Sequence, residues 1–114
     1  MSTIAIFGAT GRTGSRLVHA ALAAGHVVRA LVRDPSRVAP REGLTVLAGD
    51  VLDPEAVART VAGCDGAIAA LGAGTTADPG TTRSQGIRHI VAALEAGGGG
   101  RLLAVGGGGV LDST

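Results

Sequence analysis

The chain has 114 residues, of which 46% are hydrophobic, and its formal net charge is +1. This size and balance predict one soluble globular domain and exclude a disordered segment or a basic nucleic-acid-binding protein. No apolar stretch is long enough to span a bilayer, and nothing resembles a signal peptide. We therefore expect a cytoplasmic protein that binds neither membranes nor nucleic acid.

The sequence contains no Lys and no Tyr, and Phe7 is its only aromatic residue. The absence of Lys and Tyr excludes, within this chain, a Tyr-x-x-x-Lys dyad, a Schiff-base lysine and a phosphate loop that ends in Lys. Cys64 is the only cysteine and is expected to fill space in the interior. No histidine, cysteine or carboxylate lies at the spacing of a metal site or a catalytic triad, so we predict no metal and assign no catalytic residue.

Short apolar runs, typical of strands buried on both faces, alternate with longer segments of helical periodicity. Gly25 is expected to end the first helix in the left-handed conformation, and Asp53 to cap the second. The alternation predicts one α/β domain over residues 1–114, a Rossmann-type doubly wound parallel sheet of order 3-2-1-4-5 in three αβα layers. Strands are predicted over residues 3–7, 27–32, 44–48, 67–71 and 102–105, and helices over residues 12–24, 54–62 and 82–96.

The turn after the first strand reads GATGRTG, residues 8–14. Gly8 permits a tight exit from the strand, Gly11 lets the backbone approach a pyrophosphate, and Gly14 lets the helix pack closely on the sheet. The pyrophosphate would lie at the helix N-terminus, where free amides and the helix dipole favour an anion. Because the motif stands between a buried strand and an amphipathic helix, we predict dinucleotide binding rather than a structural turn.

The end of the second strand bears on the choice of cofactor. Arg33 stands there with Arg37 one turn later, and two guanidinium groups suit the 2′-phosphate of NADPH. Asp34 could instead bind a ribose hydroxyl, which keeps NADH open as the cofactor. The alternative to both is a charged turn that is merely solvated. We favour NADPH.

Two further strand ends belong to the same edge of the sheet. Asp50 and the backbone of Val51 follow the third strand, where they could hydrogen-bond the adenine ring. Leu71 and Gly72 end the fourth strand, where a glycine lets the chain pass close to the ribose and the nicotinamide. Ligands of such sheets bind outside the carboxyl ends of the strands, so we predict that all four residues line the cofactor site.

The segments GATGRTG (8–14), LVRDPSR (31–37), GDVLDPE (49–55) and GIRHIVAALEA (86–96) resemble the atypical short-chain dehydrogenase/reductases. The resemblance is strongest to the biliverdin-IXβ/flavin reductases and the NmrA-like NAD(P)-binding proteins. It implies that Arg33 and Arg37 hold the 2′-phosphate and that Asp50 and Val51 flank the adenine. It also implies that the pyrophosphate is bound by Gly8, Thr10, Gly11, Arg12, Thr13 and Gly14.

The chain departs from this family in two ways. The flavin-reductase relatives carry a serine at the end of strand five, facing the nicotinamide, where this chain has the hydroxyl-free run of residues 105–109. Family members also continue beyond strand five, so the chain resembles a C-terminally truncated member. Strand five would then be an uncovered edge, through which two copies could form a homodimer.

The resemblance implies an NADPH-dependent oxidoreductase that transfers hydride to a flavin or a quinone-like small-molecule acceptor. Hydride chemistry belongs to the cofactor, so the missing serine, Tyr and Lys weaken this function less than others. The alternative is a non-catalytic NADP(H)-binding sensor of the NmrA-like kind. The absence of Tyr and Lys argues against a sugar-nucleotide epimerase.

Overall fold

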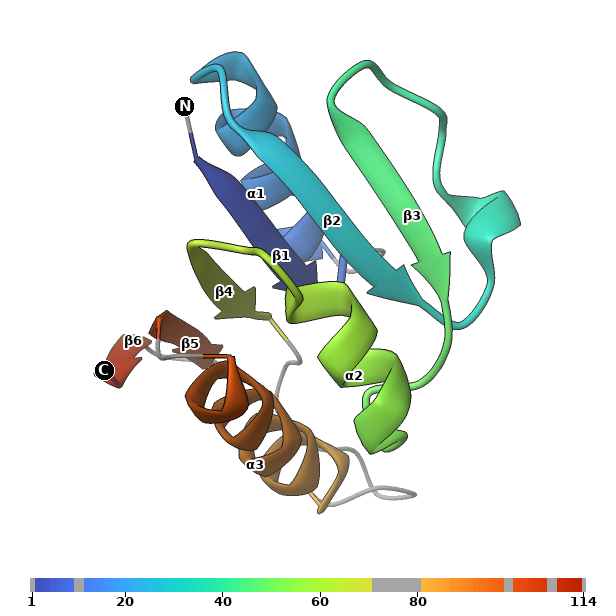
Figure 1. Cartoon of the computed structure of the whole chain (residues 1–114). Coiled ribbons are helices and arrows are strands. Elements are labelled where there is room, and N and C mark those ends of the chain that lie inside the picture. Colours follow the sequence, from blue (N-terminus) through green and yellow to red (C-terminus); the bar gives the residue numbers. More distant parts are fainter. Residues whose placement is uncertain (1, 10–11, 71–80, 98–99, 107–108, 114) are drawn as a thin grey trace.

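The structure, a computed structural model, describes the backbone of residues 2–9, 12–70, 81–97, 100–106 and 109–113. It describes the side chains of these ranges apart from residues 12, 81–84, 104–106 and 109–113. Among the described residues, no helix has both the length and the apolar character that crossing a membrane requires. The helical elements are α1 (Arg12–Ala23), η1 (Pro35–Arg37, a short 3-10 turn), α2 (Pro54–Val61) and α3 (Thr81–Ala96). The strands are β1 (Thr3–Phe7), β2 (Val27–Val32), β3 (Leu44–Ala48), β4 (Gly66–Ala69), β5 (Arg101–Gly106) and β6 (Gly109–Ser113) (Figure 1).

The strands form one sheet in the order β3-β2-β1-β4-β5-β6. The strands from β1 to β5 are parallel, which confirms the predicted order 3-2-1-4-5. β6 was not predicted. It runs antiparallel to β5, with Gly106 opposite Gly109 and Leu102 opposite Ser113. The expectation that strand five is an uncovered edge is therefore wrong, because β6 satisfies its outer hydrogen bonds. A homodimer through the edge stays a prediction and would use β6.

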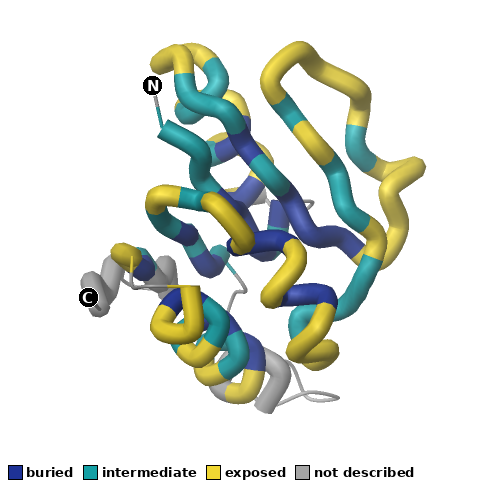
Figure 2. The backbone as a smooth tube through the Cα atoms, in the orientation of Figure 1, coloured by how far each residue is buried: buried dark blue, intermediate teal, exposed yellow. Residues whose placement is uncertain are grey.

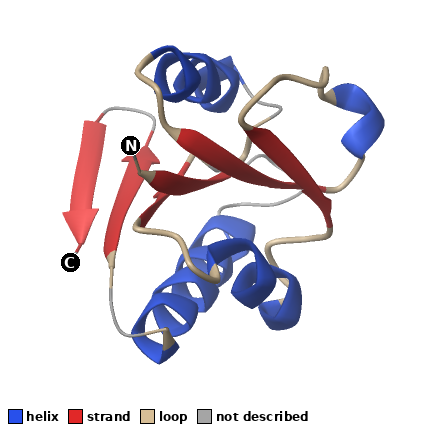
Figure 3. Ribbon diagram, turned by 45° about the horizontal axis from the view of Figure 1, so that its top comes forward, coloured by secondary structure: helices blue, strands red, loops and turns tan. Residues whose placement is uncertain are grey.

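Helices cover both faces of the sheet, with α1 on one face and α2 and α3 on the other, in the three layers that were predicted (Figure 3). Consecutive residues of a strand point to opposite faces. Ala5 and Phe7 accordingly pack under α2 and α3, whereas Ile6 packs under α1. All three are at most 1% exposed. Figure 2 shows that buried positions follow the inner strands and the helix sides that face them.

The helix ends follow the local signals in the sequence. Gly25 has φ +89°, and the amide of His26 donates to the Ala21 carbonyl at 3.0 Å, which closes α1 as expected. Asp53 caps α2, since its Oδ1 accepts a hydrogen bond from the Glu55 amide at 3.1 Å. Both predicted caps are confirmed. α1 and α2 each end one residue earlier than predicted.

The side chain of Arg29, on β2, binds the C-terminal end of α2. Arg29 on β2 donates through Nη2 to the Arg59 carbonyl at 2.8 Å and through Nη1 to the Ala62 carbonyl. A cation at a helix C-terminus satisfies free carbonyls and opposes the negative end of the helix dipole. α2 is thus fixed on β2 with its N-terminus at the carboxyl edge of the sheet, where the predicted site residues lie.

Candidate functional site

Three of the predicted site segments meet at one edge of the sheet. Parallel strands end on the same side, and the arrowheads of β1, β2 and β3 point to that side in Figure 1. Gly8 leaves β1 there, Arg33 leaves β2, and Asp50 follows the residue that leaves β3. This is the edge at which doubly wound folds bind ligands.

Gly8 and Gly14 bring the first turn of α1 against the exit of β1. Gly8 has φ +88°, a conformation that side chains disfavour. A Cβ atom at Gly14 would overlap the Gly8 carbonyl oxygen and would lie 2.6 Å from the Gly8 carbonyl carbon. This is the close contact between helix and strand that was expected of the last glycine in the motif. It directs the N-terminus of α1 to the edge of the sheet.

The positive end of α1 is free of internal carboxylates. The first turn of the helix contains no acidic residue, so its dipole is not neutralised from within. Thr13 is exposed in this turn. Of the other residues predicted for the pyrophosphate, Thr10 and Gly11 lie outside the described residues, as does the side chain of Arg12.

The exit of β4 lies next to the exit of β1. The amide of Ala70 donates to the Phe7 carbonyl at 2.8 Å, one residue before Gly8. Leu71 and Gly72, predicted to pass the ribose and the nicotinamide, lie outside the described residues. The position of Ala70 agrees with the predicted side of the site, and the roles of Leu71 and Gly72 stay predictions.

Arg33 and Asp50 form an ion pair across the ends of β2 and β3. Arg33 Nε lies 3.7 Å from Asp50 Oδ2, and the two side chains are 77% and 41% exposed. Asp50 Oδ1 accepts a hydrogen bond from the Leu52 amide at 2.9 Å. The two oxygens of Asp50 thus have different partners, one in its own loop and one on the neighbouring strand exit.

Asp34 and Arg37 belong to the short turn η1. Asp34 Oδ1 accepts the Ser36 hydroxyl at 2.6 Å and the Ser36 amide at 3.1 Å. These two hydrogen bonds, with a smaller contribution from the charge of Arg37, hold the pKa of Asp34 below its ordinary value. Arg37 is exposed. Asp34 is therefore engaged as the cap of η1, and its Oδ1 is already used twice.

Gly49 lies directly before Asp50, in a narrow gap between α2 and β2. The sequence analysis assigned it no role. Its amide donates to the Val32 carbonyl at 2.9 Å, which extends the pairing of β3 with β2. A Cβ atom here would lie 2.9 Å from the Ala56 side chain and 3.0 Å from Leu31. Only glycine fits between α2 and β2 without a shift, and the sequence signal for this was its place directly after an apolar strand.

His89 on α3 was also missed. Its Nδ1 lies 3.0 Å from the carbonyl oxygen of Val51, a half-buried residue in the loop after β3. The sequence analysis assigned no histidine to a site, and the contact is to backbone rather than to a ligand set or a triad. Among the described residues no group of three His, Cys, Asp or Glu side chains is placed to hold a metal.

A hollow of about 390 Å³ lies away from this edge, between the C-terminal ends of α2 and α3. It is lined mainly by small apolar residues, with Cys64 at one side. Burial raises the pKa of the Cys64 thiol, which donates to the Thr60 carbonyl at 3.3 Å. A raised pKa disfavours the thiolate, and we assign no function to the hollow.

Comparisons with known proteins identify the family and the fold. A family model described as NAD(P)H-binding matches residues 8–114. Uronate dehydrogenase from Agrobacterium tumefaciens has a similar fold, with a TM-score of 0.77 and 21% identity over 92% of this chain and 40% of that enzyme. At this identity the likeness shows the fold alone.

Two further solved structures extend the comparison. A protein of Burkholderia pseudomallei is 33% identical, with a TM-score of 0.74 over 94% of this chain and 48% of its own. The enzyme WbmG of Bordetella bronchiseptica, solved in complex with NAD and UDP, is 25% identical, with a TM-score of 0.75 over 89% of this chain and 36% of its own. The chain spans less than half of each of these three proteins.

Proposed function

The chain belongs to the NAD(P)H-binding family, and on that premise we propose that it binds NADPH along the carboxyl edge of β1, β2 and β3. We propose further that it is the cofactor-binding part of an oxidoreductase that transfers hydride to a flavin or a similar conjugated acceptor. The observation that carries the proposal is the meeting of Arg33 and Asp50 beside the exit of β1.

The fit of a pyrophosphate is supported by the turn between β1 and α1. Gly14 has no room for a side chain, because a Cβ would overlap the backbone of Gly8. The helix start therefore comes close to the strand exit, with no carboxylate in its first turn to repel an anion. Free amides and the helix dipole at this point would bind the phosphates of the cofactor.

Arg33 is the main candidate for the 2′-phosphate. Its side chain is 77% exposed, and its ion pair with Asp50 is long, at 3.7 Å, so its donors remain available to a ligand. Arg37 stands four residues later on an exposed turn and would add a second cation. A charge-assisted hydrogen bond contributes about 1.5–3 kcal/mol before solvent screening, enough to separate NADPH from NADH.

NADH is the weaker alternative. A site selective for NADH places a free carboxylate at the end of the second strand to bind the ribose hydroxyls. Asp34 has the right place in the sequence, but its Oδ1 already accepts two hydrogen bonds from Ser36. A ribose hydroxyl would have to bind through Oδ2 while the side chain keeps its orientation as the cap of η1. WbmG was solved with NAD bound, so binding of NADH to this chain should be tested as well.

The proposed acceptor rests on the resemblance to the flavin reductases and is a proposal for the whole protein. The bound nicotinamide supplies the hydride, and the protein binds and orients it. Residues 1–114 contain no Tyr and no Lys, the pair of side chains that assists proton transfer in a Tyr-x-x-x-Lys dyad. A flavin or a quinone-like acceptor demands less of such groups. The glycine run at residues 106–109, which carries no hydroxyl, favours the non-catalytic NADP(H) sensor as the second candidate.

The test is calorimetric titration of the 114-residue chain with NADPH and with NADH. We expect tighter binding of NADPH, and a loss of about tenfold to a hundredfold in Arg33→Ala with little change for NADH. Arg41→Ala is the matched control, because Arg41 is exposed before the start of β3, at the opposite edge of the sheet. Equal losses in both variants, or tighter binding of NADH, would contradict the assignment.

A second measurement separates the enzyme from the sensor. The protein is mixed with NADPH and either FMN or a quinone, and the decrease in NADPH absorbance is followed. Oxidation that depends on the protein and is reduced in Arg33→Ala supports the oxidoreductase. Tight NADPH binding with no oxidation by any acceptor of this class supports the sensor instead.

A further inference from the structure

We propose that His89 is a positioning residue for the adenosine end of the cofactor site, acting on Arg33 through a single peptide unit. The inference rests on the proposed function, since it concerns the same site. His89 lies on α3, far in the sequence from the three strand exits that form the site.

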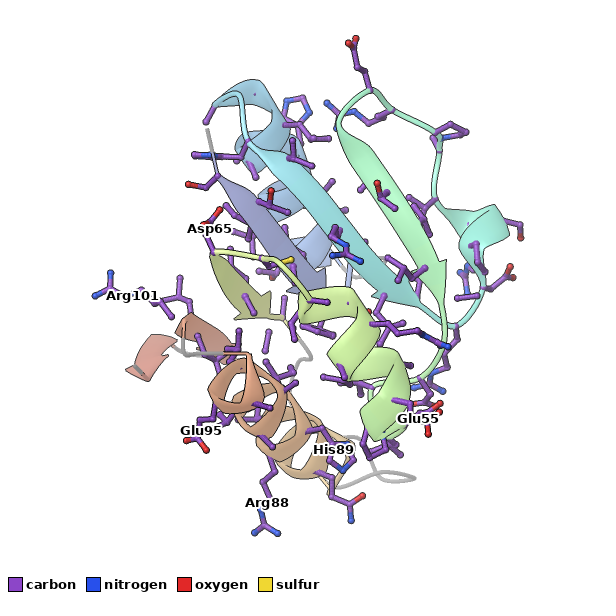
Figure 4. The ribbon with its side chains drawn as sticks, viewed as in Figure 1. Glu55, Asp65, Arg88, His89, Glu95 and Arg101 are labelled. Carbon is purple, nitrogen blue, oxygen red and sulfur yellow. The ribbon has the colours of Figure 1, made fainter. Side chains whose placement is uncertain are left out.

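The positioning would act through a series of contacts, called the relay below. Its first contact joins α3 to the loop after β3. His89 Nδ1 lies 3.0 Å from the Val51 carbonyl oxygen. In Figure 4, His89 extends from the side of α3 that faces the base of α2, whereas its neighbour Arg88 points away from both helices. A carbonyl oxygen can only accept, so the imidazole must carry its proton on Nδ1.

The peptide unit that accepts from His89 also donates to Asp50. The Val51 carbonyl and the Leu52 amide belong to the same planar group. The Leu52 amide donates to Asp50 Oδ1 at 2.9 Å. This plane is therefore held at its oxygen by α3 and at its nitrogen by the carboxylate, and turning it would break both contacts.

The second oxygen of Asp50 makes the next contact of the relay, at the exit of β2. Asp50 Oδ2 lies 3.7 Å from Arg33 Nε. The order of contacts is thus imidazole, peptide unit, carboxylate and guanidinium, from α3 to the exit of β2. Two of these contacts are hydrogen bonds, and they limit where the peptide plane and the carboxylate can lie. The third is an exposed ion pair, through which the charge of Asp50 biases the position of the Arg33 guanidinium group.

The histidine has a close chemical substitute. The side-chain amide of Asn can place an N–H donor near the position of the imidazole Nδ1, whereas Leu fills similar space without a donor. In His89→Leu the Val51 carbonyl loses its partner, and the peptide plane keeps one of its two contacts, from the Leu52 amide to Asp50 Oδ1, so it is held less firmly. His89→Asn should retain the relay. Arg88→Leu, one residue earlier on the exposed side of α3, is the control for changes in the helix itself.

Two measurements test the proposal. The first is long-range ¹⁵N–¹H NMR of the ligand-free protein, which reports which ring nitrogen of His89 is protonated; we expect Nδ1. The second is calorimetric titration with adenosine 2′,5′-bisphosphate, the half of NADPH that contacts Arg33. We expect about three- to tenfold weaker binding in His89→Leu, and near-normal binding in His89→Asn and Arg88→Leu.

Failure of this inference is distinguishable from failure of the proposed function. Normal binding in His89→Leu, or a neutral ring with its proton on Nε2, would overturn the positioning role and leave the cofactor site standing. An equal loss in His89→Leu and His89→Asn would also overturn it, because a donor would then not be what matters. No binding by the wild-type chain would reject the cofactor site and the positioning role together.

Discussion

Arg33 Nε lies 3.7 Å from Asp50 Oδ2, and this contact joins the exits of the neighbouring strands β2 and β3. The pair stands in solvent, with side chains that are 77% and 41% exposed. Exposed ion pairs of this kind contribute about 0–1 kcal/mol to stability, because water screens the charges and both side chains lose freedom. The fold therefore does not depend on the pair, which leaves both groups available to a ligand.

This leads to a prediction for unfolding. In a double-mutant cycle of Arg33→Ala and Asp50→Asn, the coupling in the free energy of unfolding should be below about 1 kcal/mol. Asn retains an oxygen that can accept from the Leu52 amide, so the cycle isolates the charge pair. Urea unfolding followed by circular dichroism measures it. A coupling above about 2 kcal/mol would mean that the pair is structural.

Gly14→Ala tests the contact between α1 and β1. The added methyl group would overlap the backbone of Gly8, so the helix has to move away from the strand. We expect a loss of about 1–3 kcal/mol in the free energy of unfolding, typical of overpacking, together with at least about tenfold weaker NADPH binding. The control is Gly97→Ala, whose Cβ would meet its nearest atom at an ordinary 3.5 Å. Similar losses in both variants would point to a general cost of replacing glycine.

Arg29→Met tests the tie between β2 and the C-terminus of α2. The substitution keeps an apolar stem but removes the donors to the Arg59 and Ala62 carbonyls. Because Arg29 is half-buried, we expect a moderate loss of about 1–3 kcal/mol in the free energy of unfolding. Thermal and urea unfolding measure the effect, with Arg41→Met as the exposed control. An unchanged midpoint in Arg29→Met would show that the carbonyls find water instead.

The lowered pKa of Asp34 predicts that the stability of the turn η1 depends on pH. Hydrogen bonds from Ser36 stabilise the ionised carboxylate, so its pKa in the folded protein lies below the usual value near 3.8. A depressed pKa contributes stability that is present above the unfolded-state value and is lost as the pH falls through the folded-state value. NMR titration of the Asp34 carboxyl should show the lowered pKa, and Ser36→Ala should return part of the shift. A pKa at or above 3.8 in the wild type would contradict the cap.

Much of the fold is predictable because its signals are local. The bounds of β1, β2 and β3 agree with the apolar runs to the residue, since glycine or polar residues flank each run. Gly25 and Asp53 mark helix ends for reasons confined to a few residues. β6 was missed because it begins within the run of four glycines at residues 106–109, so neither alternation nor a turn signal distinguishes it.

The candidate site is predictable in part. Arg33 and Asp50 were placed at one edge because parallel strands end together, and the structure brings them into contact. The contact of His89 with Val51 could not be foreseen, because it joins positions 38 residues apart and its acceptor is a backbone carbonyl. Gly49 was passed over because its tight fit depends on how α2 crosses β2.

The central place of β1 has a consequence for synthesis on the ribosome. β1 pairs on one side with β2, but on the other side with residues 66–69. Until the ribosome has synthesised those residues, the N-terminal strand has one open flank, and the buried side chains Ala5 and Phe7 lack α3, one of the two helices that cover them. Pairings between distant segments form slowly, and exposed strand edges attract other chains in the meantime. A nascent chain that stalls before β4 is therefore a target for chaperones, although every residue of its glycine turn has already been made.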